Sequence, residues 1–145
     1  MLMLAVILAP AMLRAQVIKH WVGGSGAWGQ AEHWSLGPGG PGGDGVPRAN
    51  EDVLIAPEVP ISVTLDGDVI CRDLRVDARH AELTLTGVTA NDLVINGGWV
   101  MAGNVDWKAE GTVILKARDA AVIDLHGIAV RSHLVLDGTG TWDQL

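Results

Sequence analysis

The sequence contains no Tyr and no Phe, so its six aromatic residues are all Trp. Hydrophobic residues still make up 48% of the 145-residue chain, which is enough for the core of one domain. Without Tyr and Phe, that core must be built mainly from Val, Leu, Ile and Ala. The composition therefore predicts a layered aliphatic interior.

Cysteine and positive charge are also scarce. Cys71 is the single cysteine, so no internal disulfide can form, and its strand-like surroundings indicate a small buried hydrophobic residue. Ten Lys and Arg residues stand against 17 Asp and Glu residues, which gives a net charge of −7 without any basic run. Nucleic acids are bound mainly through clustered Lys and Arg. The charge balance therefore argues against a nucleic-acid partner.

The spacings that build metal sites are missing. The five His residues are scattered, and none shows the i, i+4 or C-x-x-C pattern of a zinc site. Asp44, Asp66 and Asp68 lie in Gly-containing turns and offer oxygen ligands for calcium. Because the full calcium-loop spacing is absent, turn chemistry explains them better. The sequence predicts no metal and no cofactor.

Two charged groups are the remaining candidates for catalysis. Asp124 and His126 share the outward face of one predicted strand, where a solvated surface is the simpler interpretation. The second group alternates in sign along neighbouring strand segments: Arg72, Asp73, Arg75, Asp77 and Arg79. Such alternation usually means mutual neutralisation, and no positioned base accompanies it. We therefore expect that the protein is not an enzyme.

Residues 1–15 are predicted to be a secretory signal peptide. The stretch MLMLAVILAPAMLRA is apolar and ends in small residues, but it is too short to span a bilayer as a helix. Cleavage fits after Ala11 or after Ala15, and Ala15 is preferred because QVIKHWV then opens the mature chain. No Lys or Arg precedes the apolar run, so a misassigned start or an uncleaved anchor explains it equally well. With cleavage, we expect a secreted or surface protein of bacteria whose mature chain has no membrane-spanning segment.

Residues 16–51 are rich in Gly and Trp and are predicted to form an N-terminal cap. Trp21, Trp28 and Trp34 are interleaved with GGSG and followed by GPGGPGGDGVP, which cannot be helical. A stacked β-structure needs such a cover, because the open end of its first layer exposes backbone groups and apolar side chains.

Residues 52–145 repeat a short strand-and-turn phrase every nine or ten residues. Examples are ISVTLDG from Ile61, AELTLTG from Ala81 and SHLVLDGTG from Ser132. Alternate residues are apolar, which predicts Leu134 and Leu136 on the inward face together with Ile61, Val63, Leu65, Leu74, Val76, Leu83, Leu85, Val113 and Leu115. Two or three phrases give a coil of roughly 20 to 25 residues and about four coils in all. We predict an all-β, single-stranded parallel β-helix, with an antiparallel β-sandwich as the alternative.

The pattern stops directly after a TW phrase without a closing element. We therefore expect a C-terminally truncated repeat region. An uncovered last coil would expose strand edges and apolar side chains. Its predicted partners are further β-helix repeats or another copy of the chain, stacked on that coil.

These segments together resemble the N-terminal region of bacterial secreted parallel β-helix proteins of the autotransporter and adhesin kind. The resemblance rests on WVGGSGAWGQAEHWS, GVPRANEDVLI and HLVLDGTGTWDQL, with His33 where the family pattern usually has Asn. It covers nearly the whole mature chain. It implies a right-handed coil and an extracellular location, and it specifies no chemistry.

The function expected from these observations is mechanical: a rigid stalk or passenger segment of a bacterial surface protein. The alternative is a carbohydrate-binding module that stacks sugars of surface polysaccharides on Trp21, Trp28 and Trp34, since Trp combines a large apolar face with a polar N–H. Rings in a cap more often form its own core. A polysaccharide lyase-like enzyme is a distant third possibility.

Overall fold

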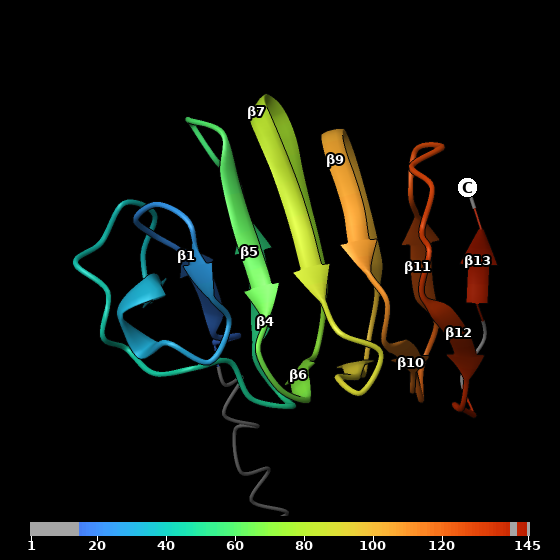
Figure 1. Ribbon diagram of the computed structural model, residues 1–145. Helices are drawn as coiled ribbons and strands as arrows, with labels where there is room; N and C mark the ends of the chain where they lie inside the picture. Colours follow the sequence, from blue (N-terminus) through green and yellow to red (C-terminus); the bar gives the residue numbers. More distant parts are fainter. Residues whose placement is uncertain (1–14, 140–141, 145) are drawn as a thin grey trace, which may run out of the picture.

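The computed structural model describes residues 15–139 and 142–144, and it contains a β-solenoid of about four turns (Figure 1). Its elements are β1 (Ile18–Trp21), β2 (Gly26–Ala27), the 3₁₀ helix η1 (Ala31–His33), β3 (Trp34–Ser35), β4 (Asp52–Ile55), β5 (Ile61–Leu65), β6 (Val69–Cys71), β7 (Leu74–Gly87), β8 (Leu93–Ile95), β9 (Trp99–Ala109), β10 (Thr112–Leu115), β11 (Ala121–Asp124), β12 (His133–Leu136) and β13 (Trp142–Gln144). The coils lie side by side, from the blue β1 to the red β13. The predicted signal peptide lies outside the described residues, apart from its last residue.

Each coil of the solenoid has three sides. One side is a four-stranded sheet in the order β12-β10-β8-β6. The other two sides belong to a nine-stranded sheet that contains β13, β11, β9, β7, β4, β1 and β3, with β2 and β5 beside them. This sheet turns a corner where the register of β7 and β9 shifts between Ala78 and Leu83. As a result, β4 pairs with the start of β7 and β5 pairs with its end.

Strands in successive coils pair in parallel. Partners are 20 residues apart where Val113 pairs with Leu93, and 25 residues apart where Trp99 pairs with Leu74. Of the described strand pairs, only β1 with β3 is antiparallel. The predicted parallel β-helix is thus confirmed. The antiparallel β-sandwich is wrong, because parallel strands at this separation need a coil and cannot be joined by hairpins. The right-handed sense stays a prediction from the resemblance.

The core consists of inward-facing side chains stacked from coil to coil. Val63 and Leu85 pair in register and are fully buried, and Trp107 continues the row at 2% exposure. All the side chains predicted to face inward in the first three coils are buried. The prediction fails for Leu134 and Leu136, which are 52% and 60% exposed. They keep register with the buried Val113 and Leu115. However, β12 is the edge strand of its sheet, so a neighbouring strand, β10, lies on one side of them only.

The segment before β4 packs against the first coil. Strand β1 pairs with β4 and β2 pairs with β5, so both sides of the nine-stranded sheet continue into this segment. Strand β3 then folds back antiparallel on β1, with Trp21 opposite Trp34. Among the residues that the structure describes, no helix has the length and apolar character needed to cross a membrane.

Candidate functional site

The three Trp residues predicted to stack on sugars form an aromatic cluster inside the molecule. Trp28 and Trp34 are fully buried, and Trp21 is 8% exposed. Trp34 meets Trp28 and Trp21 edge to face, with ring centroids 4.9 and 5.1 Å apart. The Nε1 of Trp34 donates a hydrogen bond of 2.7 Å to the Trp28 carbonyl oxygen. A sugar-stacking platform needs exposed ring faces. The structure does not provide that platform, because these rings are part of the hydrophobic core.

His33 completes this cluster from its outer side. Its ring stacks on Trp21, with centroids 4.6 Å apart and planes inclined by 2°. Its Nδ1 lies 3.0 Å from the Val22 carbonyl oxygen. The ring therefore holds the loop after β1 in place. His33 is the residue that stands where the pattern of the resembling proteins usually has Asn. Its contacts here show that it packs against Trp21 and the loop after β1.

A groove lies at the corner that follows the four-stranded sheet. It has a volume of about 760 Å³ and crosses the turns of several coils. Its walls are mostly polar, with both signs of charge: Arg72, Asp73, Asn96, Lys116, Arg118, Asp119 and Asp137. Gly97 lies among them, where a Cβ atom would overlap the Asp73 carboxylate. The described lining residues thus present amide, carboxylate and cationic groups.

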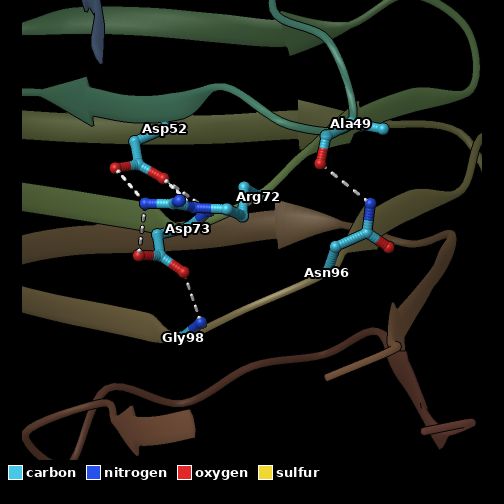
Figure 2. Close-up of polar contacts among 6 residues, drawn as sticks. All are labelled: Ala49, Asp52, Arg72, Asp73, Asn96 and Gly98. Atoms are coloured by element: carbon cyan, nitrogen blue, oxygen red, sulfur yellow. Dashed lines mark hydrogen bonds and ion pairs between the residues drawn. The ribbon is translucent and has the colours of Figure 1, made fainter. Parts of the chain in front are cut away.

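A salt-bridge network lies at one end of the groove (Figure 2). Arg72 binds both carboxylate oxygens of Asp52, at 2.8 and 2.9 Å. It also lies 3.7 Å from Asp73, whose Oδ1 accepts a hydrogen bond of 2.8 Å from the Gly98 N–H. Asp52 is 13% exposed. Burial and the negative charge of Asp73 raise the pKa of Asp52, while Arg72 opposes the rise.

The same arrangement of carboxylate and backbone recurs at a second corner. Asp68 accepts a hydrogen bond of 2.9 Å from the Asp92 N–H, and Asp92 accepts one of 3.2 Å from the Thr112 N–H. In both rows, an Asp at or just before the start of one strand accepts a hydrogen bond from the backbone N–H at or just before the start of the paired strand in the next coil. We call these two rows the corner ladders: Asp52, Asp73 and Gly98 in one, and Asp68, Asp92 and Thr112 in the other. They join coils and satisfy N–H groups that the strands leave unpaired.

The other carboxylates singled out in the sequence also bind nearby groups. Asp66 accepts a hydrogen bond from the Gly29 N–H at 2.8 Å, and Asp44 accepts one from the Leu36 N–H at the same distance. Gly29 lies 37 residues from Asp66 and Leu36 lies eight residues from Asp44, so these contacts join separate loop segments, and the local turn chemistry of these residues stays a prediction. In the part of the chain that the structure covers, no group of three or more His, Cys, Asp or Glu residues is arranged to hold a metal ion.

The charged group around β7 does not converge on one point. Arg79 binds both oxygens of Asp77, at 2.7 and 2.6 Å, whereas Arg72 is engaged with Asp52. The exposed Arg75 lies between them, in register with Leu54 and Val100. Cations that bind different carboxylates along a strand neutralise them locally and do not assemble a catalytic centre.

Asp124, the last residue of β11, and His126 do meet. The Nδ1 of His126 lies 3.1 Å from Asp124 Oδ1 and 2.7 Å from the Met101 carbonyl oxygen. Because both neighbours are acceptors, Nδ1 is the ring nitrogen that donates here. His126 also has a φ of 48°. The pair closes the turn after β11 against β9 of the preceding coil, and no described nucleophile or third ligand accompanies it.

Burial makes Cys71 a core residue. Its side chain is fully buried in β6, and burial raises the pKa of its thiol. A thiol that stays protonated is a poor nucleophile. Cys71 therefore packs as the small hydrophobic residue that the sequence predicted.

Comparisons with models of protein families, with curated proteins and with solved structures gave no match. The resemblance to surface β-helix proteins accordingly stays a prediction from sequence.

The sequence analysis did not predict the groove or the corner ladders. For the ladders, the sequence does contain a recognisable pattern. Asp52 and Asp73, like Asp68 and Asp92, recur at the coil period just before a buried strand residue.

Proposed function

We propose that the chain is a structural module, a rigid β-solenoid segment that acts as a stalk or passenger part of a secreted or surface protein of bacteria. The observation that supports this most strongly is the use of its polar side chains. The carboxylates of the corner ladders bind backbone groups of the next coil, so they contribute to stiffness along the axis. Side chains in such contacts are unavailable for catalysis.

The continuity of the core supports the same role. Stacked aliphatic rows run through successive coils, and Trp99 and Trp107 pack together within them at 5.1 Å. Each coil in such an array is stabilised by its neighbours, so the module resists extension as a unit. A stalk needs this property, whereas an enzyme needs a preorganised set of reactive groups.

A further coil stacked on β12 is the partner that fits this role. Leu134 and Leu136 point along the buried rows but are more than half exposed. A strand added beside β12 would cover them and pair with its backbone edge. Such a coil would come from further repeats or from a second copy of the chain.

Single-molecule force spectroscopy tests the stalk role. The chain is pulled from its two ends between well-characterised reference domains. We expect discrete force peaks, and we expect lower peaks for Leu85→Ala, because that substitution leaves a cavity in the coil-to-coil row. Thr89→Ala, at an exposed turn, serves as the matched control and should behave like the unchanged chain. Featureless extension at the low forces of an unfolded linker would contradict the proposal.

Saccharide binding is the second candidate, at the groove instead of the buried Trp cluster. Amide, carboxylate and guanidinium groups of the kind that line the groove are suited to sugar hydroxyl groups. Titration with oligosaccharides from plant, algal and bacterial polysaccharides, followed by amide NMR shifts, tests this candidate. Shifts confined to residues 116–121 and lost in Asp119→Ala would support it, and an absence of shifts with every saccharide would refute it.

A further inference from the structure

The outer face of the four-stranded sheet carries a continuous aliphatic row. One residue from each coil contributes: Ile70, Val94, Ile114 and Val135, which pair in register from β6 to β12. Their strand neighbours Val69, Cys71, Val113 and Leu115 point into the core, so the row faces outward. Val135 is 42% exposed, and the other three are partly exposed. A protein surface usually places polar residues at such positions of a strand.

Polar residues form a row on each side of this aliphatic row. The row two positions before it consists of Asp68, Asp92, Thr112 and His133. The row two positions after it consists of Arg72, Asn96, Lys116 and Asp137. One flank thus begins with two acids, and the other carries two cations and ends with an acid.

We propose that this face pairs with the same face of a second copy of the chain. A two-fold axis through the middle of the face places the aliphatic row of one copy on the row of the other, which makes the contact isologous. The strand spacing is identical in both copies, so β-branched side chains can interdigitate between the two sheets.

The charges beside the aliphatic row favour a second copy of the chain as the partner that binds this face. If the axis runs along the solenoid, equal coils face each other and Asp68 lies opposite Arg72 of the other copy. If the axis runs along the strands, the coil order reverses and Arg72 lies opposite Asp137. In both arrangements, no two residues of like charge face each other across the contact. Self-complementary charge of this kind favours association of identical faces.

The size of the face sets the strength of the contact. It is four strands wide, at about 4.8 Å per strand, and it is only three or four residues long. This is well below the roughly 800 Å² per partner of a stable dimer. We therefore expect a weak dimer that forms with rising concentration. Alignment in a crowded surface layer would favour it further.

Sedimentation equilibrium of residues 16–145, from about 10 μM to 1 mM, tests the association. The mean mass should rise toward that of a dimer, and Ile114→Lys should keep the chain monomeric. Val100→Lys is the matched control, because Val100 is a partly exposed outward residue of β9 on another side of the solenoid. Ile114→Thr, a smaller change, covers the case in which the Lys variant does not fold. A monomer over the whole range, or equal loss in Val100→Lys, would overturn the proposal.

Cysteine cross-linking supplies an independent measurement. In a Cys71→Ala background, Ile70→Cys should form a disulfide-linked dimer under copper-catalysed air oxidation if equal coils face each other. If the coil order is reversed, a mixture of Ile70→Cys and Val135→Cys should cross-link instead. Either product supports the contact and reports its orientation. Absence of both, while Thr89→Cys gives the same background, would overturn it.

Discussion

The carboxylate of Asp73 accepts a hydrogen bond of 2.8 Å from the N–H of Gly98, and it thereby joins the residue before β7 to the residue before β9. Asp73 in turn donates its own N–H to Asp52, at 3.3 Å. Three successive coils are thus connected outside their sheets. Each bond adds a side-chain contact at a corner where backbone hydrogen bonds, such as that from the Leu74 N–H to the Gly98 carbonyl oxygen, also join the coils.

Substitution of Asp73 should therefore destabilise the solenoid. Asp73→Ala leaves the Gly98 N–H without its partner, and we expect a loss of about 1 to 2 kcal/mol of unfolding free energy. Asp73→Asn should lose less, since the amide oxygen can still accept the bond. Urea unfolding followed by far-UV circular dichroism measures both.

Asp119→Ala is the matched control for this comparison, because Asp119 is an exposed acid in the same groove. Its unfolding free energy should stay within about 0.5 kcal/mol of the unchanged chain. Equal effects of Asp73→Ala and Asp119→Ala would show that the ladder contributes nothing. Loss of the Asp73 charge should also lower the pKa of Asp52, since that charge helps to raise it.

The sequence predicts the coil but not the way its corners are held. Alternation of apolar residues determines which side chains of β5, β7 and β10 face inward, because a strand has a period of two. Contacts such as Asp73 with Gly98 join residues 25 positions apart, and they depend on the length of the intervening turns. Local patterns carry little information about that length. The recurrence of Asp before buried strand residues becomes a signal only once the register of the coils is known.

Gly103 should be irreplaceable at the corner of β9. Its φ is 89°, and a Cβ atom there would overlap the backbone of Ala78 in the preceding coil. Gly103→Ala combines an unfavourable backbone conformation with that overlap, so a loss of about 2 kcal/mol or more is expected. Gly67→Ala, at a turn with open space around it, should change the stability far less. Thermal unfolding measures the midpoint temperatures of both variants. Similar midpoints would show that Gly103 is not required at this corner.

The ion pair of Asp77 with Arg79 should stabilise the solenoid near neutral pH and lose this effect in acid. The hydrogen bonds from the Arg79 side chain lower the pKa of Asp77 to about 2. A carboxyl with a depressed folded pKa contributes stability above its unfolded pKa of about 3.9, and the contribution is lost as the pH falls toward 2. Carbon-detected NMR of the side-chain carboxyls should give a midpoint near pH 2 for Asp77. In Arg79→Ala, the midpoint should return toward the ordinary value.

The matching stability measurement compares Asp77→Asn with the unchanged chain between pH 2 and pH 5. The variant lacks the titrating group, so its unfolding free energy should fall less steeply as the pH decreases. Arg79 is largely exposed and Asp77 is partly exposed, so the difference should be small and should shrink in high salt. Identical slopes together with an unshifted Asp77 midpoint would mean that the ion pair is not maintained in solution.

The burial of the cap Trp residues could not be predicted from local composition, because it depends on tertiary structure. Sequence gives their number and their spacing in a Gly-rich stretch, and both a binding platform and a packed core satisfy that pattern. The choice depends on what the rings pack against, and here Trp21 pairs with Trp34 across β1 and β3 while the His33 ring stacks on Trp21. Burial of this kind comes from contacts that no short motif encodes.

Fluorescence of the intact chain should therefore report buried indole rings. Because Trp28, Trp34, Trp99 and Trp107 are at most 2% exposed, we expect blue-shifted emission and weak quenching by acrylamide. Saccharides that bind in the groove should leave the emission of these four rings unchanged, because none of the four is among the described residues that line it. Trp34→Phe should lower the unfolding free energy, because it removes the hydrogen bond to the Trp28 carbonyl oxygen and leaves that buried acceptor unpaired. A saccharide-dependent shift that disappears in Trp34→Phe, with the β-sheet signal preserved, would instead mean that the cap opens to expose its rings.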